Sequence, residues 1–124
     1  MDINQLITSF WKDVANQDAT ALRKYFGENA LINWHNTNES FSVSEYIIAN
    51  CEYPETWSGQ VERIEIIENI AISVTKVWSA SMIVHSTSFF EFYNGKIIKL
   101  DEYWGDDGVA PKWRLDKNIG NKIK

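Results

Sequence analysis

Asn94 and Gly95 constrain the fold of this chain more than any other residues, because they separate two long runs rich in aromatic and β-branched side chains. Asn and Gly tolerate the positive φ angles of a type I′ turn, so the pair predicts a two-residue β-hairpin. The turn also predicts the register, since Tyr93 then pairs with Lys96 and every later pair follows from it. We therefore expect a long antiparallel hairpin in the last third of the chain.

One face of this hairpin is predicted to be mostly apolar. Its side chains are Ile83, His85, Thr87, Phe89, Ile98, Leu100, Glu102 and Trp104. In the predicted register Thr87 pairs with Glu102 and His85 pairs with Trp104, so the histidine and the carboxylate are diagonal neighbours. An apolar face that holds two ionisable groups side by side is typical of the floor of a ligand pocket.

Helices are predicted in the first half of the chain from periodicity and capping residues. Apolar residues at helical spacing predict a helix over residues 2–16. Asp18 is the expected N-cap of a short second helix, which Gly27 should end. Ser42 and Glu45 form a capping box that opens a third helix. Strands are expected at residues 30–35, 61–68, 71–78, 82–93 and 96–104.

Helices followed by a run of antiparallel strands indicate an α+β fold, in which the helices cover one face of a bent sheet, within a single domain spanning residues 1–124. The order of elements, the motif LINWH at 31–35 and the final strand GKIIKLDEYW at 95–104 resemble the nuclear-transport-factor-2-like superfamily. That superfamily includes ketosteroid isomerases, limonene epoxide hydrolase and SnoaL-like polyketide cyclases. The resemblance implies a curved antiparallel sheet wrapped around the N-terminal helices, a cone-shaped pocket and frequent dimerisation through the outer sheet face.

Glu102 and His85 are the predicted catalytic residues. Apolar surroundings would raise the pKa of the carboxyl group, whereas a protonated histidine would lower it, and opposed effects can bring a group close to neutrality. Such a pair could move a proton on a carbonyl or enol-type substrate. The alternative is a buried hydrogen bond that satisfies two polar groups in the core.

Substrate contacts are predicted around this pair. Trp34 and His35 stand at the end of a strand beside a polar loop, where pocket mouths lie, and alternation allows only one of them to face the cavity. Tyr53 and Trp57 follow the third helix, a segment that the resemblance implies borders the pocket. The predicted contacts are Trp34, His35, Tyr53, Trp57, Thr87, Phe89, Leu100 and Trp104.

Composition excludes several classes of partner. The net charge of −5 and the lack of a basic stripe argue against nucleic acid and disfavour an anionic substrate. One cysteine and two histidines favour no metal site, and no cofactor is expected. No stretch reaches the roughly 18 apolar residues of a membrane span, and no secretory signal is present, so we expect a cytoplasmic protein without a membrane partner.

The sequence therefore predicts a cofactor-independent enzyme that performs acid–base chemistry on a small apolar carbonyl-bearing molecule. The alternative is a non-catalytic module that binds a hydrophobic ligand or only its dimer partner, since this kind of cone hosts many functions. A homodimer is expected because the second face of the hairpin should expose an apolar patch. The predicted patch is Val84, Phe90, Phe92, Ile97 and Tyr103.

Overall fold

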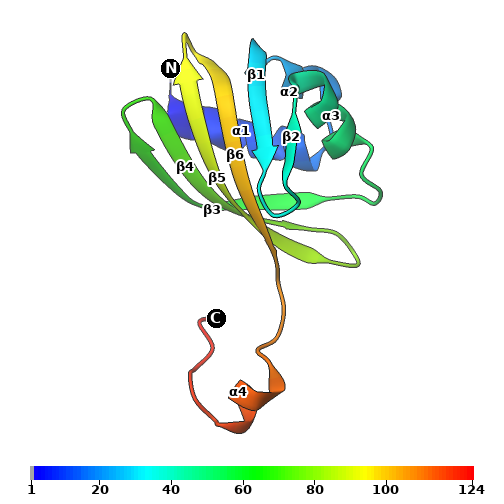
Figure 1. The fold of residues 1–124 in the computed structure, drawn as a ribbon, viewed down its shortest axis with the longest axis vertical. Coiled ribbons are helices and arrows are strands. Elements are labelled where there is room, and N and C mark those ends of the chain that lie inside the picture. The colour runs from blue at the N-terminus through cyan, green and yellow to red at the C-terminus, as the bar shows by residue number, and fades with distance from the viewer. Residues whose placement is uncertain (1) are drawn as a thin grey trace.

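The computed structural model describes residues 2–124, whose six strands form one sheet in the order β2-β1-β6-β5-β4-β3. The strands are β1 (Phe26–Trp34), β2 (Glu39–Phe41), β3 (Ser58–Ile67), β4 (Ile70–Trp78), β5 (Ile83–Tyr93) and β6 (Lys96–Asp106). The helices are α1 (Ile3–Ala15), α2 (Ala19–Arg23), α3 (Val43–Cys51) and α4 (Lys112–Asp116). All neighbouring strands are antiparallel except β1 and β6. The α+β prediction is confirmed, with α1 crossing one face of the sheet (Figure 1).

The predicted helix starts are confirmed by their capping bonds. The Asp18 side chain accepts from the backbone of α2, and both reciprocal bonds of the Ser42–Glu45 capping box are present at α3. The predicted helix stop at Gly27 is wrong. Helix α2 already ends at Lys24 in right-handed helical geometry, and Gly27 lies within β1.

The β5–β6 turn forms as predicted, but the register beyond it does not. Asn94 and Gly95 have φ angles of 49° and 75°, and Tyr93 pairs with Lys96. A β-bulge then follows, because Ile98 on β6 has no partner on β5. Every pair beyond the bulge is displaced by one residue, which moves a whole set of side chains to the other face of the sheet.

Because of the bulge, the side chains of β5 face the opposite sides of the sheet from those predicted. Glu102 pairs with Ser88 instead of Thr87, and His85 lies opposite Gly105. The predicted inward set of β5 therefore lies on the outer face: Ile83, His85, Thr87 and Phe89. The predicted dimer patch is also wrong for four of its five residues, since Phe90, Phe92 and Ile97 are buried and Val84 is partly buried on the inner side, leaving Tyr103 exposed.

The inner face of the sheet packs against α1 and is apolar at the end near the β5–β6 turn. Phe10 of α1 sits at the centre of this apolar end, where four aromatic rings meet its ring edge-on. Phe90 and Leu100 of the sheet are fully buried beside it. Burial of these large side chains closes one end of the space between sheet and helices.

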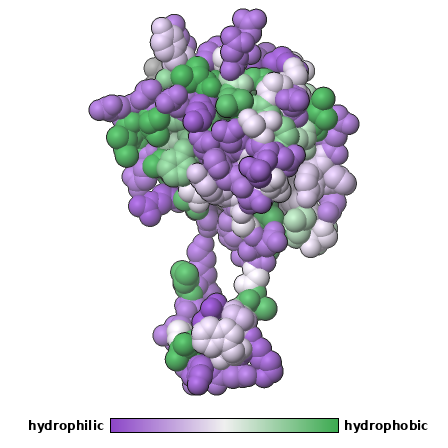
Figure 2. Space-filling view, viewed as in Figure 1, coloured by the Kyte–Doolittle hydropathy of each residue, from purple (hydrophilic) through white to green (hydrophobic). Residues whose placement is uncertain are grey.

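After β6 the chain leaves the body of the molecule. Figure 1 shows residues 109–124, including α4, standing apart below the sheet, and Figure 2 shows the same segment as a separate lobe. Among residues 2–124, no helix is long and apolar enough to cross a membrane.

Candidate functional site

A band of polar side chains crosses the inner face of the sheet, beyond its apolar end. Two cross-strand rows form it: Ser73, Ser88 and Glu102, and then Thr75, Ser86 and Trp104. The serines, the threonine and Glu102 are at most 1% exposed. Buried polar groups are costly unless they are hydrogen-bonded, so a band of this kind needs an explanation.

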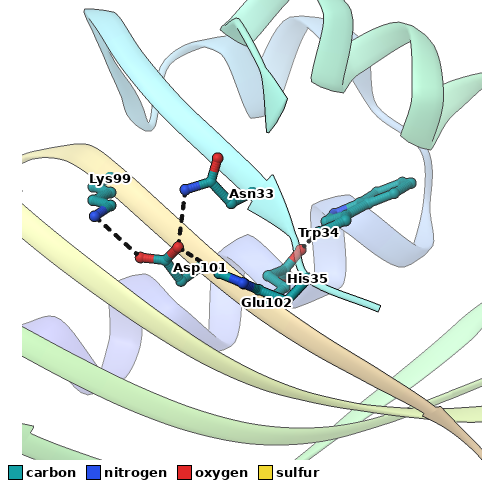
Figure 3. Close-up of polar contacts among 6 residues, drawn as sticks. All are labelled: Asn33, Trp34, His35, Lys99, Asp101 and Glu102. Carbon is teal, nitrogen blue, oxygen red and sulfur yellow. Dashed lines mark hydrogen bonds and ion pairs between the residues drawn. The ribbon is translucent and has the colours of Figure 1, made fainter. Parts of the chain in front are cut away.

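Glu102 is at the centre of a hydrogen-bond network within this band. The Ser88 hydroxyl donates to its Oε2 at 2.7 Å, and the Trp34 indole donates from Nε1 to its Oε1 at 3.1 Å. Ser86 Oγ lies 2.8 Å from Ser88 Oγ, which extends the network along β5. On β4, Ser73 Oγ accepts from Trp11 Nε1 of α1 at 3.0 Å. Figure 3 shows Trp34 and Glu102 together.

Burial raises the pKa of Glu102 from 4.5 to about 7, because a carboxylate loses its hydration there. Hydrogen bonds from Ser88, Trp34 and Ser86 lower the pKa and offset part of that effect. No basic side chain is among the causes of the shift. A carboxyl group with a pKa near neutrality can both accept and give up a proton at physiological pH.

A cavity of about 320 Å³ opens next to this polar band, where the end of α1 meets the β4–β5 connection. Four of the predicted substrate contacts line it: Trp34, Tyr53, Trp57 and Trp104. Its charged lining residues are the carboxylates Glu39 and Asp106, and no Lys, Arg or His side chain lines it. Trp34 links the cavity to Glu102, because its ring forms part of the wall while its Nε1 donates to the carboxylate.

Two buried polar atoms beside Glu102 have no hydrogen-bond partner among the described residues. They are Oγ1 of Thr75 and Nε1 of Trp104. Both belong to the row nearest the cavity, and Trp104 lines the cavity itself. Trp104 Nε1 can donate a hydrogen bond to a ligand oxygen, whereas Thr75 does not line the cavity.

The structure places His85 outside this site. It lies on the outer face, with Nε2 2.8 Å from Oδ1 of Asp107, so the predicted pairing of His85 with Glu102 is wrong. Thr87 and Phe89 share that outer face because of the bulge. Leu100 does point inward, but it is fully buried in the apolar end and does not line the cavity.

Trp34 and His35 face opposite sides, as alternation requires. His35 lies on the outer side, where Nε2 is 2.7 Å from Oδ1 of Asp101 (Figure 3). Its ring stacks on Tyr103 with the ring centroids 4.3 Å apart. Partial burial raises the pKa of Asp101, but hydrogen bonds from Asn33 and His35 outweigh it and leave that pKa below its usual value. His35 is therefore part of an outer-face cluster and not of the cavity wall.

The hydroxyl residues that hold Glu102 were not predicted from the sequence. Ser86 and Ser88 look like solvent-facing residues in a strand with aromatic residues on both faces. Their role depends on the register, which the bulge at Ile98 hides. The available signal was the spacing of Ser86 and Ser88, two residues apart and so on one face of the strand.

A wider groove of about 750 Å³ lies between α1 and β3. Its polar lining residues include Asn4, Lys12 and Arg63, and Glu102 and the hydroxyl band are not among them. Trp34 and Trp104, which connect the smaller cavity to Glu102 and the hydroxyl band, do not line this groove, so we place the candidate site in the smaller cavity. Among residues 2–124, no group of three His, Cys, Asp or Glu side chains is arranged to hold a metal ion.

Neither a family model nor a curated protein matches this sequence, but solved structures match its fold over nearly the whole chain. An NTF2-like protein of unknown function from Burkholderia xenovorans has a TM-score of 0.81 at 21% identity, covering 98% of this chain and 95% of that one. A protein named as a candidate ketosteroid isomerase from Kribbella flavida has a TM-score of 0.80 at 16% identity, covering 97% and 88%.

An epoxide hydrolase from M. tuberculosis, described as LEH-like, has a TM-score of 0.66 at 11% identity, covering 82% of this chain and 80% of that one. The chain therefore has the NTF2-like fold shared by SnoaL-like and ketosteroid-isomerase-like proteins. At these identities the likeness establishes the fold, and function must be argued from the site.

Proposed function

We propose that this protein is a cofactor-independent enzyme that transfers a proton on a small carbonyl-bearing molecule held in the 320 Å³ cavity, with Glu102 as the acid–base group. The observation that carries the proposal is the burial of Glu102 behind the cavity wall with a pKa of about 7. Of the two residues predicted to act together, Glu102 alone remains in this proposal.

The unpartnered donor of Trp104 supports a carbonyl substrate. A carbonyl oxygen that accepts from Trp104 Nε1 would satisfy a buried donor and would be polarised toward an enol. Glu102, in its ionised form, would take the proton from the carbon next to that carbonyl and return it. Proton transfer requires Trp34 to turn aside, because its ring forms the cavity wall and its Nε1 covers one carboxylate oxygen.

The charge of the cavity narrows the substrate class. Glu39 and Asp106 are its charged lining residues, so an anionic molecule would meet like charge without a compensating cation. The aromatic rings of Trp34, Tyr53 and Trp57 favour an apolar or weakly cationic body. A small neutral ketone fits both conditions.

A second candidate function is ligand binding without turnover. It is favoured by one observation: both oxygens of Glu102 already accept hydrogen bonds, and Glu102 does not itself line the cavity. In this case Glu102 would hold Trp34 in place, and the cavity would bind an apolar molecule.

Proton exchange measured on Glu102→Gln separates the two functions. Gln can accept from Trp34 and donate to Ser88, so the fold should survive while the ionisable group is lost. With cyclohexanone-sized enolisable ketones in heavy water, NMR should show protein-catalysed exchange next to the carbonyl, and Glu102→Gln should lose about 100-fold or more of it. Glu91→Gln is the matched control, because Glu91 faces the outer side of the sheet.

Exchange that is unchanged in Glu102→Gln would refute the role of Glu102. Exchange no faster than in buffer, with ketone binding intact, would instead establish the binding function.

Trp104→Phe tests the carbonyl contact. The change removes the indole N–H and keeps an aromatic wall, so ketone affinity should fall by about tenfold, the size expected for one lost hydrogen bond. Affinity for a hydrocarbon of the same shape should change by less than about twofold, because a hydrocarbon has no oxygen to accept a hydrogen bond from Trp104. Titration by ligand-observed NMR measures both, and an equal loss for ketone and hydrocarbon would show that Trp104 contributes only shape.

A further inference from the structure

Residues 109–124, near the C-terminal end of the chain, carry apolar side chains that the rest of the chain leaves uncovered; we call this segment the C-terminal arm. Five of them are exposed: Val109, Trp113, Leu115, Ile119 and Ile123. Helix α4, within the arm, has no buried residue. Figure 2 shows the arm as a lobe apart from the body, with hydrophobic groups on its surface. Exposed apolar groups concentrated in one short segment mark an interaction surface.

The arm also differs from the rest of the chain in charge. Residues 109–124 contain five Lys or Arg and one Asp, a net charge of +4. The rest of the sequence contains seven Lys or Arg and sixteen Asp or Glu, a net charge of −9. A basic arm is therefore attracted to an acidic body of this same kind.

The outer face of the sheet offers apolar surface next to carboxylates. Leu31, Phe89 and Tyr103 on this face are between 38% and 49% exposed. Asp101 and Asp107 lie among them, but each already pairs with a histidine within 2.8 Å, and Lys99 lies 3.7 Å from Asp101. This outer face therefore complements the arm through its exposed apolar side chains, whereas the charge attraction comes from the acidic body as a whole.

The matches to the Burkholderia and Kribbella proteins span 98% and 97% of this chain, so the aligned region extends into the arm.

We infer that two copies of this chain exchange their C-terminal arms, each arm packing on the outer sheet face of the other copy. Within one copy, the arm touches the body through an ion pair from Lys124 to Glu62, at 3.0 Å, and its apolar side chains remain exposed. A two-fold arrangement lets each copy donate one arm and accept one, so both uncovered surfaces are buried at once. The arm exchange is independent of the proposed catalytic role of Glu102.

The first test changes the arm in the full-length chain. The double variant Trp113→Ser/Leu115→Ser removes two exposed apolar groups of α4 and disturbs no buried contact. Sedimentation velocity should give a dimer for the unsubstituted protein and a dissociation constant raised by about 100-fold or more for the double variant. Ile48→Ser is the matched control, because Ile48 is about as exposed as Trp113, 57% against 62%, but lies on helix α3 and not on the outer face of the sheet.

Two results of this test would overturn the exchange. The first is that the unsubstituted protein is a monomer. The arm would then either fold back on its own chain or bind anionic membranes such as phosphatidylserine vesicles. The second is a dimer that dissociates equally in the double variant and the unsubstituted protein. Binding to these vesicles is measured in parallel. If the unsubstituted protein is monomeric and binds the vesicles, and the double variant does not bind them, the arm is a membrane-binding segment.

The second test locates the contact by disulfide cross-linking in a Cys51→Ser background, since Cys51 is the only cysteine. A mixture of Leu115→Cys and Thr87→Cys proteins should form a mixed disulfide dimer, because the arm of one chain would lie on the outer face of the other. The mixture of Leu115→Cys with Ile48→Cys is the control, because Ile48 is exposed on α3 and not on the outer face. Equal cross-linking in the two mixtures would contradict docking on the outer face.

Discussion

Raising the pH from 4.5 to about 8 is expected to destabilise this protein by about 3 kcal/mol through Glu102 alone. The folded-state pKa of Glu102, about 7, is above the ordinary value of 4.5, so the folded protein keeps the Glu102 proton over a range in which the unfolded chain has lost it. The stabilisation from that proton is complete below pH 4.5 and is lost as the pH rises to about 7.

The measurement is chemical denaturation across this pH range for the unsubstituted protein and Glu102→Gln. Other carboxyl groups titrate in both proteins, and those with lowered pKa values, such as Asp101, act in the opposite direction at low pH. The difference in free energy of unfolding between the two proteins cancels those groups. The free energy of unfolding of the unsubstituted protein, minus that of Glu102→Gln, should decrease by about 3 kcal/mol as the pH rises. A difference that stays constant with pH would show that Glu102 has an ordinary pKa.

Phe90→Ala is expected to cost about 3–5 kcal/mol of unfolding free energy, and Phe89→Ala about 1 kcal/mol or less. Phe90 is fully buried and packs edge-on against Phe10, whereas its neighbour Phe89 is 38% exposed on the outer face. Urea denaturation at the same low protein concentration compares the two variants without a contribution from self-association.

This pair of variants also tests the register of the hairpin. The register read from the Asn94-Gly95 turn alone places Phe89 inside and Phe90 outside, which predicts the reverse order of stabilities. A larger loss for Phe89→Ala would therefore contradict the bulge at Ile98 and, with it, the separation of His85 from Glu102.

Those parts of the fold that depend on local signals could be predicted from the sequence. The capping residues Asp18 and Ser42 and the turn at Asn94 each act through bonds or dihedral angles within a few residues, and each is present in the structure. The bulge is different, because Ile97 and Ile98 are both apolar and either register buries aromatic side chains. Local pattern therefore could not choose between the two faces of β5.

The residues of the candidate site that lie on β6 and in the loops could be predicted from the sequence. Glu102 and Trp104 point inward in both registers, and Tyr53 and Trp57 line the cavity as the resemblance implied. His85 was misplaced because its position depends on pairing across the bulge. The serine partners of Glu102 were missed for the same reason, since a buried hydroxyl next to a carboxyl group is recognised only once the register is known.

The role of Glu102 is tested most directly by an NMR pH titration of its side-chain carboxyl carbon in the free protein, with Glu102→Gln used to assign the signal. Proton transfer at neutral pH requires a carboxyl group that changes its charge there. We predict a titration midpoint at about 7. A midpoint near the ordinary value of 4.5 would contradict the proposed role of Glu102.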